Sequence, residues 1–272
     1  MSILTHGSDL TLSPAIGPLV RPRNITVRAT LDQLARLNCH SIQLDATLPG
    51  LRPRELSVRA RRDLLAMLNR RNVRPAGLDL FIPRKHYTDP DHVDRAMAAT
   101  TAAIELAHHL GRLPVSLALP VKRLPDELRS ALVEAADGHG VRLAIHAEDQ
   151  LDHLETWLND VDLPALGAAI DPAALLARGH DPAAIAQRLG KYLAVARLSD
   201  IDRSAADDDD DAGEAVRCPV GSGELDLIPY RVSLDLAVNR VGPVVLDPRG
   251  LPNPYAAFAA ARHAWENAAF TA

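Results

Sequence analysis

The sequence predicts an α/β protein of the (β/α)8 TIM barrel type, formed by a single domain over residues 1–272. Eight short apolar segments alternate with eight helical segments along the whole chain. The length agrees, because 272 residues divided among eight units give 34 residues per unit, and such barrels typically contain about 250 residues. No internal repeat and no change of composition marks a boundary between domains.

Eight segments predict strands because each is short, apolar and bounded by turn residues. They are Leu10 to Ser13, Ser41 to Asp45, Ala76 to Ile82, Val115 to Leu119, Val141 to His146, Leu166 to Asp171, Leu193 to Ser199 and Val244 to Asp247. The sixth shows the pattern most clearly. In LGAAIDP, Pro172 cannot extend a sheet, which leaves Asp171 as the last strand residue.

The segments between the strands predict helices, because their apolar residues recur every three to four positions. They lie at Leu31 to Leu37, Leu56 to Arg71, about Val93 to Ile104, about Leu128 to Ala135, Leu151 to Leu158, Asp181 to Gly190, from Leu227 onward and about Pro254 to Asn267. Asp89-Pro90 and Asp181-Pro182 both predict helix starts, since aspartate caps the first turn and proline is tolerated in it.

The composition excludes several classes of protein. The chain is 47% hydrophobic and 24% charged, with a net charge of −5, so the composition as a whole does not suggest a nucleic-acid surface. It has no basic start followed by an apolar stretch and no run near ~18 apolar residues, so we expect no membrane contact. Cys39 and Cys218 are far apart and match no metal or redox spacing. We therefore expect a cytoplasmic protein.

Polar residues gather at the carboxyl ends of the strands. Alternation along each strand places its apolar side chains toward the outer helices and the others toward the barrel centre. The inward residues are Gln43, Asp45, Asp79, Ser116, His146, Asp171, Arg197 and Asp247. Barrel interiors are normally filled with branched apolar residues, and barrel enzymes place their chemistry at this end. Five strands that end in polar residues together therefore predict a functional site.

From SIQLD to the last helix, the chain resembles the xylose isomerase-like barrel superfamily of sugar isomerases, epimerases and endonuclease IV-type enzymes. In VRLAIHAED, His146 stands where the family carries a metal-binding Glu. Asp171 is kept at the end of the sixth strand, but Ala174 replaces the His that follows it. In RLSD, Asp200 is kept, and Arg197 stands where the metal-binding His belongs.

The resemblance continues toward the carboxyl terminus. The family has an Arg before a Gly-x-Gly, and RCPVGSG supplies Arg217, Gly221 and Gly223. The metal-binding Glu that ends the eighth strand is here the shorter Asp247. A frequent Glu of the second strand is here Gln43.

The resemblance implies a divalent metal, since relatives use Mn, Mg, Zn or Co. Of the four metal-holding positions only Asp171 is unchanged, although His146 and Asp247 could still act as ligands. Arg197 cannot, because a guanidinium offers only donors and stays charged. Repulsion between two like unit charges ~4 Å apart costs about 4 kcal/mol at an effective dielectric of 20, so the Arg197 charge opposes a metal ion in the same pocket. We therefore expect no tightly bound metal, and His146, Asp171 and Asp247 as ligands of any ion that does bind.

The resemblance implies an isomerase or epimerase of carbohydrate metabolism that acts on a small polyhydroxylated carbonyl compound. His146 and Asp247 are the expected acid–base pair, and Arg197 the expected stabiliser of the enediolate in place of the metal. Further substrate-binding candidates beside Arg197 are Asp171, Gln43, Arg217, His86 in the loop after the third strand, and Glu148.

A non-catalytic relative, or pseudoenzyme, that binds a sugar-like ligand or a protein partner is the alternative. A mouth filled by the protein's own ion pairs favours it, and an open pocket favours the enzyme. An acidic loop insertion at about residues 203–216 contains Asp207 to Asp211 and disfavours a polyanionic substrate. Whether the chain forms a homo-oligomer stays open.

Overall fold

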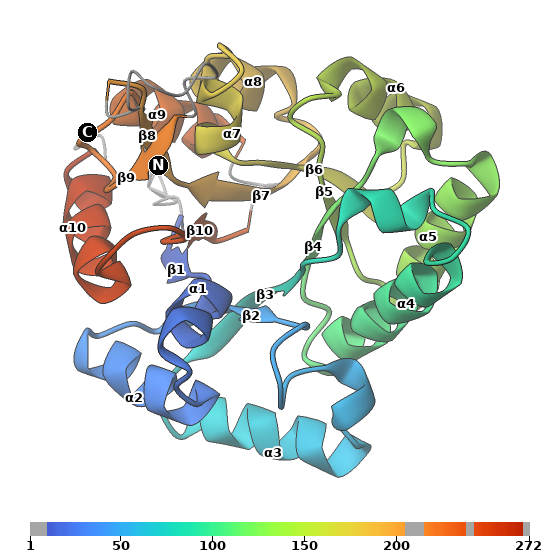
Figure 1. Cartoon of the computed structure of the whole chain (residues 1–272), viewed down its shortest axis with the longest axis horizontal. Coiled ribbons are helices and arrows are strands. Elements are labelled where there is room, and N and C mark those ends of the chain that lie inside the picture. The colour runs from blue at the N-terminus through green and yellow to red at the C-terminus, as the bar shows by residue number, and fades with distance from the viewer. Residues whose placement is uncertain (1–9, 205–214, 238–241, 269–272) are drawn as a thin grey trace, which may run out of the picture.

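Eight parallel strands surround a central axis in the computed structural model, which describes residues 10–204, 215–237 and 242–268 (Figure 1). Their order around the barrel is β1-β10-β7-β6-β5-β4-β3-β2. The bounds are β1 Leu12–Pro14, β2 Ser41–Asp45, β3 Arg74–Leu80, β4 Val115–Ala118, β5 Leu143–His146, β6 Leu166–Ile170, β7 Leu193–Leu198 and β10 Val244–Leu246. The predicted (β/α)8 barrel is confirmed.

The first and last strands bring the two ends of the chain together. Leu12 pairs with Val244, and Val245 pairs with Arg197 on β7. A single parallel bridge from Ala15 to Gln43 links the end of β1 to β2. The barrel is therefore nearly closed, and the carboxyl ends of all eight strands face one mouth.

Helices form an outer ring around the strands (Figure 1). They are α1 Ile16–Val20, α2 Val27–Arg36, α3 Val58–Asn69, α4 Val93–His109, α5 Asp126–His139, α6 Leu151–Val161, α7 Pro172–Leu176, α8 Pro182–Arg188, α9 Leu227–Leu236 and α10 Pro254–Asn267. Short 3-10 turns add η1 Arg21–Arg23, η2 Pro53–Glu55, η3 Arg84–Tyr87 and η4 Val121–Arg123. None of the helices in the described parts of the chain is long and apolar enough to cross a bilayer.

The two registers of the strands build two different layers. The outward residues belong to the main apolar core between strands and helices, as Ile42, Leu78 and Ile145 do. The inward layer is small and partly polar: Ala15, Ala144, Ala169, Ala194, Val195 and Val245 form its apolar cluster. Below the mouth, Ser13 donates to Ser41 across 2.7 Å. The interior is packed, so the mouth is the place where polar side chains can meet.

Three features differ from the sequence prediction. Asp171 is not a strand residue but the N-cap of α7, where its Oδ1 accepts from the backbone N–H of Ala173 at 3.1 Å. Asp89 does not start α4 directly; it forms a local turn with Asp91, and the helix begins at Val93. The cap at Asp181 is confirmed, since its side chain accepts from Ala183 at 2.9 Å.

The third difference is an antiparallel hairpin in what was expected to be one long loop. Strands β8, Asp200–Asp202, and β9, Val216–Cys218, pair outside the barrel. The predicted acidic stretch Asp207 to Asp211 lies outside the described residues. The hairpin matters for the site because β9 carries Arg217 back over the mouth.

Candidate active site

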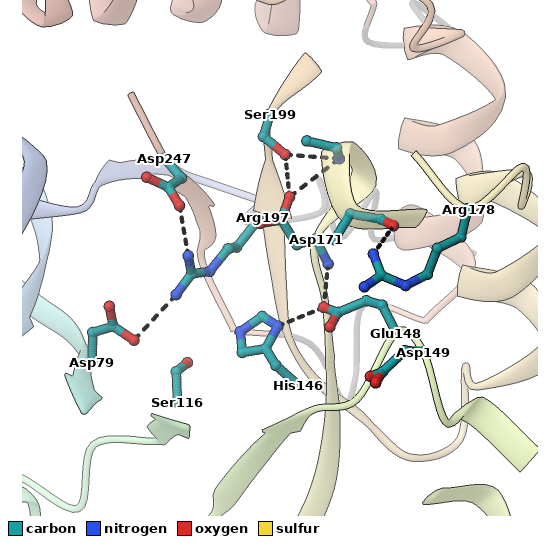
Figure 2. A network of polar contacts seen from close by, with 12 residues as sticks. Asp79, Ser116, His146, Glu148, Asp149, Asp171, Arg178, Arg197, Ser199 and Asp247 are labelled. Atoms are coloured by element: carbon teal, nitrogen blue, oxygen red, sulfur yellow. Dashed lines mark hydrogen bonds and ion pairs between the residues drawn. The ribbon is translucent and has the colours of Figure 1, made fainter. Parts of the chain in front are cut away.

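Arg197 lies at the centre of the mouth, between two carboxylates (Figure 2). Nη1 donates to Asp247 Oδ2 at 2.6 Å, and Nη2 donates to Asp79 Oδ1 at 3.1 Å. The three residues come from β7, the end of β10 and β3, so this network ties together three separate strands. The side chain of Asp247 is wholly shielded from water, and that of Arg197 is 7% exposed. The network is a buried, hydrogen-bonded triad of one guanidinium and two carboxyl groups.

Asp171 belongs to a second network next to the first. Its Oδ2 accepts from Arg217 Nη2 at 2.8 Å, and its Oδ1 accepts from the Ser199 hydroxyl at 2.5 Å. Arg217 also lies 3.7 Å from Asp247 Oδ2, which joins the two networks. Arg197 therefore pairs with Asp79 and Asp247, while the hairpin supplies the partner of Asp171.

His146 ends β5 with one ring nitrogen engaged and the other without a partner. Nδ1 lies 2.7 Å from Glu148 Oε1, and that same oxygen accepts the backbone N–H of Asp171 at 3.0 Å (Figure 2). Nε2 is buried and has no hydrogen-bond partner. With Nδ1–H donated to a fixed carboxylate, the lone pair of a neutral imidazole lies on Nε2. This nitrogen is able to take a proton.

Arg84 supports the same histidine from η3. Its Nη2 donates to the backbone carbonyl of His146 at 3.1 Å and lies 3.7 Å from Glu148 Oε2. Its Nη1 pairs with Asp149. The His146–Glu148 pair is thus held on two sides, which fixes the ring orientation.

Burial and pairing move the pKa values of the two aspartates in opposite directions. Burial raises the pKa of Asp79 above its ordinary value, and the nearby Arg197 offsets only part of that rise. Burial acts on Asp171 as well, but Arg217, Arg197 and the Ser199 hydroxyl outweigh it and hold its pKa below the ordinary value. Asp79 is therefore the carboxyl suited to carry a proton, and Asp171 stays ionised.

Two cavities open at this mouth. The inner one, of about 130 Å³, is lined by Asp79, Arg84, His146, Glu148, Asp171 and Arg197, together with Phe81, Arg249 and neighbouring apolar residues. The outer one, of about 520 Å³, adjoins it. A larger groove of about 990 Å³ between α2 and α3 contains none of the buried residues of the mouth. We place the site at the inner cavity because the unpartnered nitrogen and the buried charges converge there.

The structure separates the residues proposed from the sequence into three groups. His146, Glu148, Asp171 and Arg197 line the inner cavity, and Arg217 contacts it through Asp171. Asp247 lies behind Arg197 and lines neither of the two cavities. Gln43, a substrate-binding candidate, lies inside the barrel, where Nε2 donates to Ser116 at 3.3 Å, and it lines neither of the two cavities. His86 stacks on His92 at 4.4 Å and does not line the inner cavity.

Three further residues of the mouth were not among the proposed site residues. Asp79 could have been added, because it shares the inward register at the end of the third strand. Arg84 stands in the short 3-10 turn η3 and Arg249 in a loop, where no periodicity gives a side-chain direction. Arg249 lies 3.4 Å from Asp247 Oδ2.

A family model described as "Xylose isomerase-like TIM barrel" matches residues 31–257 of the sequence. The chain belongs to this family. The match spans every strand of the barrel except β1, and it includes all the mouth residues described above. No curated protein matches the sequence.

Several solved structures share the fold of this chain. A xylose isomerase domain protein from Planctomyces limnophilus has a TM-score of 0.71 and 18% identity over 88% of this chain and 91% of its own. A xylose isomerase-like TIM barrel protein from Mycobacterium smegmatis in complex with magnesium has a TM-score of 0.68 and 17% identity, over 89% and 87%. D-psicose 3-epimerase from Clostridium cellulolyticum H10, solved with D-tagatose, has a TM-score of 0.65 and 12% identity over 90% of this chain and 94% of its own. At these identities the likeness establishes the fold.

The donor set of this family member does not fit a divalent cation. Arg197 places a guanidinium between Asp79 and Asp247, and Arg217 places another on Asp171. Burial would lower the pKa of Arg197, but Asp79 and Asp247 raise it above its ordinary value, so it remains charged. A dication would have to displace these cations from their carboxylates. Within the described residues, no three His, Cys, Asp or Glu side chains are arranged to hold a metal ion.

Proposed function

We propose that this protein is an isomerase or epimerase that moves a proton next to the carbonyl group of a small polyhydroxylated compound, with fixed guanidinium charge in the place of a metal ion. The observation that carries the proposal is His146 Nε2, a buried nitrogen without a partner beside a cavity that also contains Asp79 and Arg197. The epimerase among the structural neighbours supports the substrate class.

His146 is the proposed base. Its Nε2 lone pair takes the proton from the carbon next to the carbonyl, and the electrons of that C–H bond form the C=C bond of an enediol. Glu148 keeps the proton of Nδ1 in place, which stabilises the imidazolium that forms. When His146 returns this proton to the former carbonyl carbon, the hydroxyl group on the neighbouring carbon gives its own proton to the Asp79 carboxylate, and the isomer forms. When water supplies a proton to the opposite face of the original carbon, Asp79 takes back the proton that it gave to the carbonyl oxygen, His146 releases its proton to solvent, and the epimer forms.

Asp79 and Arg197 are proposed to act on the carbonyl oxygen. Asp79 has a raised pKa and can donate its proton to that oxygen as negative charge develops. Arg197 presents a fixed positive charge, and its buried Nε has no hydrogen-bond partner. Asp247 holds the Arg197 guanidinium in position instead of exchanging protons, since it lies behind Arg197 and is fully shielded from water.

Exchange with solvent deuterium tests this proposal without knowledge of the product. The native protein is incubated in D2O with a panel of aldoses, ketoses and inososes, and loss of the proton next to the carbonyl is followed by NMR. We expect exchange with at least one compound, unchanged by EDTA. His146→Ala and Glu148→Gln should slow it by about 10² to 10⁴-fold, whereas His153→Ala, on the exposed face of α6, should not. Undiminished exchange in His146→Ala would refute the assignment.

The non-catalytic alternative rests on one observation, the pairing of Asp171 and Asp247 with guanidinium groups. A pseudoenzyme of this kind would bind a sugar-like ligand in the same cavity and would not exchange its protons. Binding detected by calorimetry without any deuterium exchange would decide for this alternative. A cytoplasmic location remains part of the proposal.

A further inference from the structure

The outer cavity of about 520 Å³ is continuous with the proposed reaction site. It shares Asp79, Phe81 and Arg249 with the inner cavity of about 130 Å³. One ligand can therefore extend from one cavity into the other. The outer cavity lies within the range of about 300–1,000 Å³ that is typical of ligand pockets, and the inner one alone is smaller than that range.

The wall of the outer cavity differs in chemistry from the inner cavity. Most of it is apolar, formed by Pro18, Pro22, Phe81, Pro248, Leu251 and Pro252. Four of these are prolines, whose fixed φ makes the wall rigid before any ligand binds. Its charged residues are two aspartates and two arginines, so their formal charges sum to zero. Two of them, Arg21 and Asp45, form an ion pair. This wall suits an uncharged, apolar group.

Phe81 supplies an open aromatic surface at the junction of the two cavities. It follows β3 directly, and its residue surface is 59% exposed. The Arg249 guanidinium lies over the ring, with its carbon 5.4 Å from the ring centroid. Because burial of an aromatic ring is favourable and rings pair with one another, a planar apolar group of a ligand would bind well against Phe81.

We propose that the outer cavity is a subsite for an aromatic or other apolar group attached to the polyhydroxylated part of the ligand. The ligand is then a neutral sugar that keeps its carbonyl group and carries the apolar group at another carbon, and not an unsubstituted monosaccharide. This inference rests on the proposed function, which places the polyhydroxylated carbonyl part of the ligand in the inner cavity beside His146.

Calorimetric titration with matched 6-O-methyl and 6-O-benzyl ethers of glucose, galactose, mannose and fructose, all of which keep their carbonyl group, tests the subsite. For the sugar that binds, we expect the benzyl ether to bind at least about tenfold more tightly than the methyl ether. Phe81→Ala should bring the two affinities to within about twofold. Leu236→Ala, at an exposed apolar residue of α9 away from the mouth, should keep the preference.

The outcomes separate the two proposals. Equal affinity for the benzyl and methyl ethers of a sugar that binds would overturn the subsite and leave the proposed function standing. A benzyl preference that survives in Phe81→Ala protein, shown to be folded by circular dichroism, would also overturn it. If none of the eight ethers binds, the subsite is overturned, and the proposed function falls with it only if the native protein also shows no deuterium exchange with the unsubstituted sugars.

Discussion

Arg197 Nη1 donates a hydrogen bond to Asp247 Oδ2 over 2.6 Å, between the end of β7 and the end of β10, where both side chains are shielded from water. Taking two charges out of water is costly, and the cost is offset only while each charge keeps its partner. The pair therefore fixes the geometry of the mouth. It also fixes the positive charge of Arg197 at the position where relatives are expected to carry a metal-binding His.

Replacement of Arg197 by Ala should destabilise the protein by about 3–5 kcal/mol, because Asp79 would lose the cation that it pairs with and Asp247 would keep only its longer contacts to Arg217 and Arg249. Chemical denaturation at pH 7 measures this loss. Arg188→Ala is the matched control: Arg188 pairs with Asp152 and Glu155, but its side chain is 39% exposed, so its removal should change the unfolding midpoint far less. Equal losses of unfolding stability in the two variants would contradict this expectation, because the buried Arg197 network would then stabilise the fold no more than an exposed ion pair does.

Asp171 should make stability depend on pH. Its pKa in the folded state is lowered, so its ionised form stabilises the fold above about pH 4. That contribution is lost as the pH falls through the folded pKa. Asp171→Asn keeps a side chain that can cap α7, so it removes mainly the charge.

Urea denaturation of native protein and Asp171→Asn from pH 7 to pH 3 checks this expectation. The native protein should be the more stable at pH 7, and the difference should shrink as the pH drops below about 4. A difference that is constant over this range, or that grows on acidification, would contradict the assigned direction.

The hairpin that carries Arg217 depends on Asp200. Its Oδ2 accepts the backbone N–H groups of Gly221 and Gly223, each at 3.1 Å. A Cβ at Gly223 would overlap the Ile201 carbonyl oxygen and lie 2.5 Å from Asp200 Oδ1. Gly223→Ala should therefore displace this loop and lower the unfolding temperature.

Gly138→Ala is the control for this substitution. Gly138 lies in α5, and a Cβ there meets nothing within 4 Å, so alanine should stabilise the helix by about 0.5–1 kcal/mol. Differential scanning calorimetry of the two variants should give shifts of opposite sign. A stabilised Gly223→Ala would show that the loop does not need the close approach to Asp200.

The sequence was sufficient for the barrel, because alternation along parallel strands reports which side chains face the centre. Arg197 and His146 lie inside the mouth for this reason. Asp79 was placed in the same register, although it was not proposed as a site residue. The contacts of the surrounding arginines could not be inferred, since Arg84 stands in a 3-10 turn, Arg217 in the hairpin and Arg249 in a loop, where only the tertiary structure sets side-chain direction. Gln43 has the predicted direction, but it lies too deep in the barrel to reach the rim.

Calorimetric titration of the native protein with manganese, zinc and cobalt tests the replacement of the metal by Arg197 most directly. We expect no stoichiometric binding at micromolar concentrations, and we expect Arg197→His, which restores a ligand in place of the guanidinium, to gain measurable affinity for these metals. Stoichiometric binding to the native protein at micromolar or lower concentration, abolished in Asp171→Asn, would contradict this expectation and return the protein to the metal-dependent isomerases.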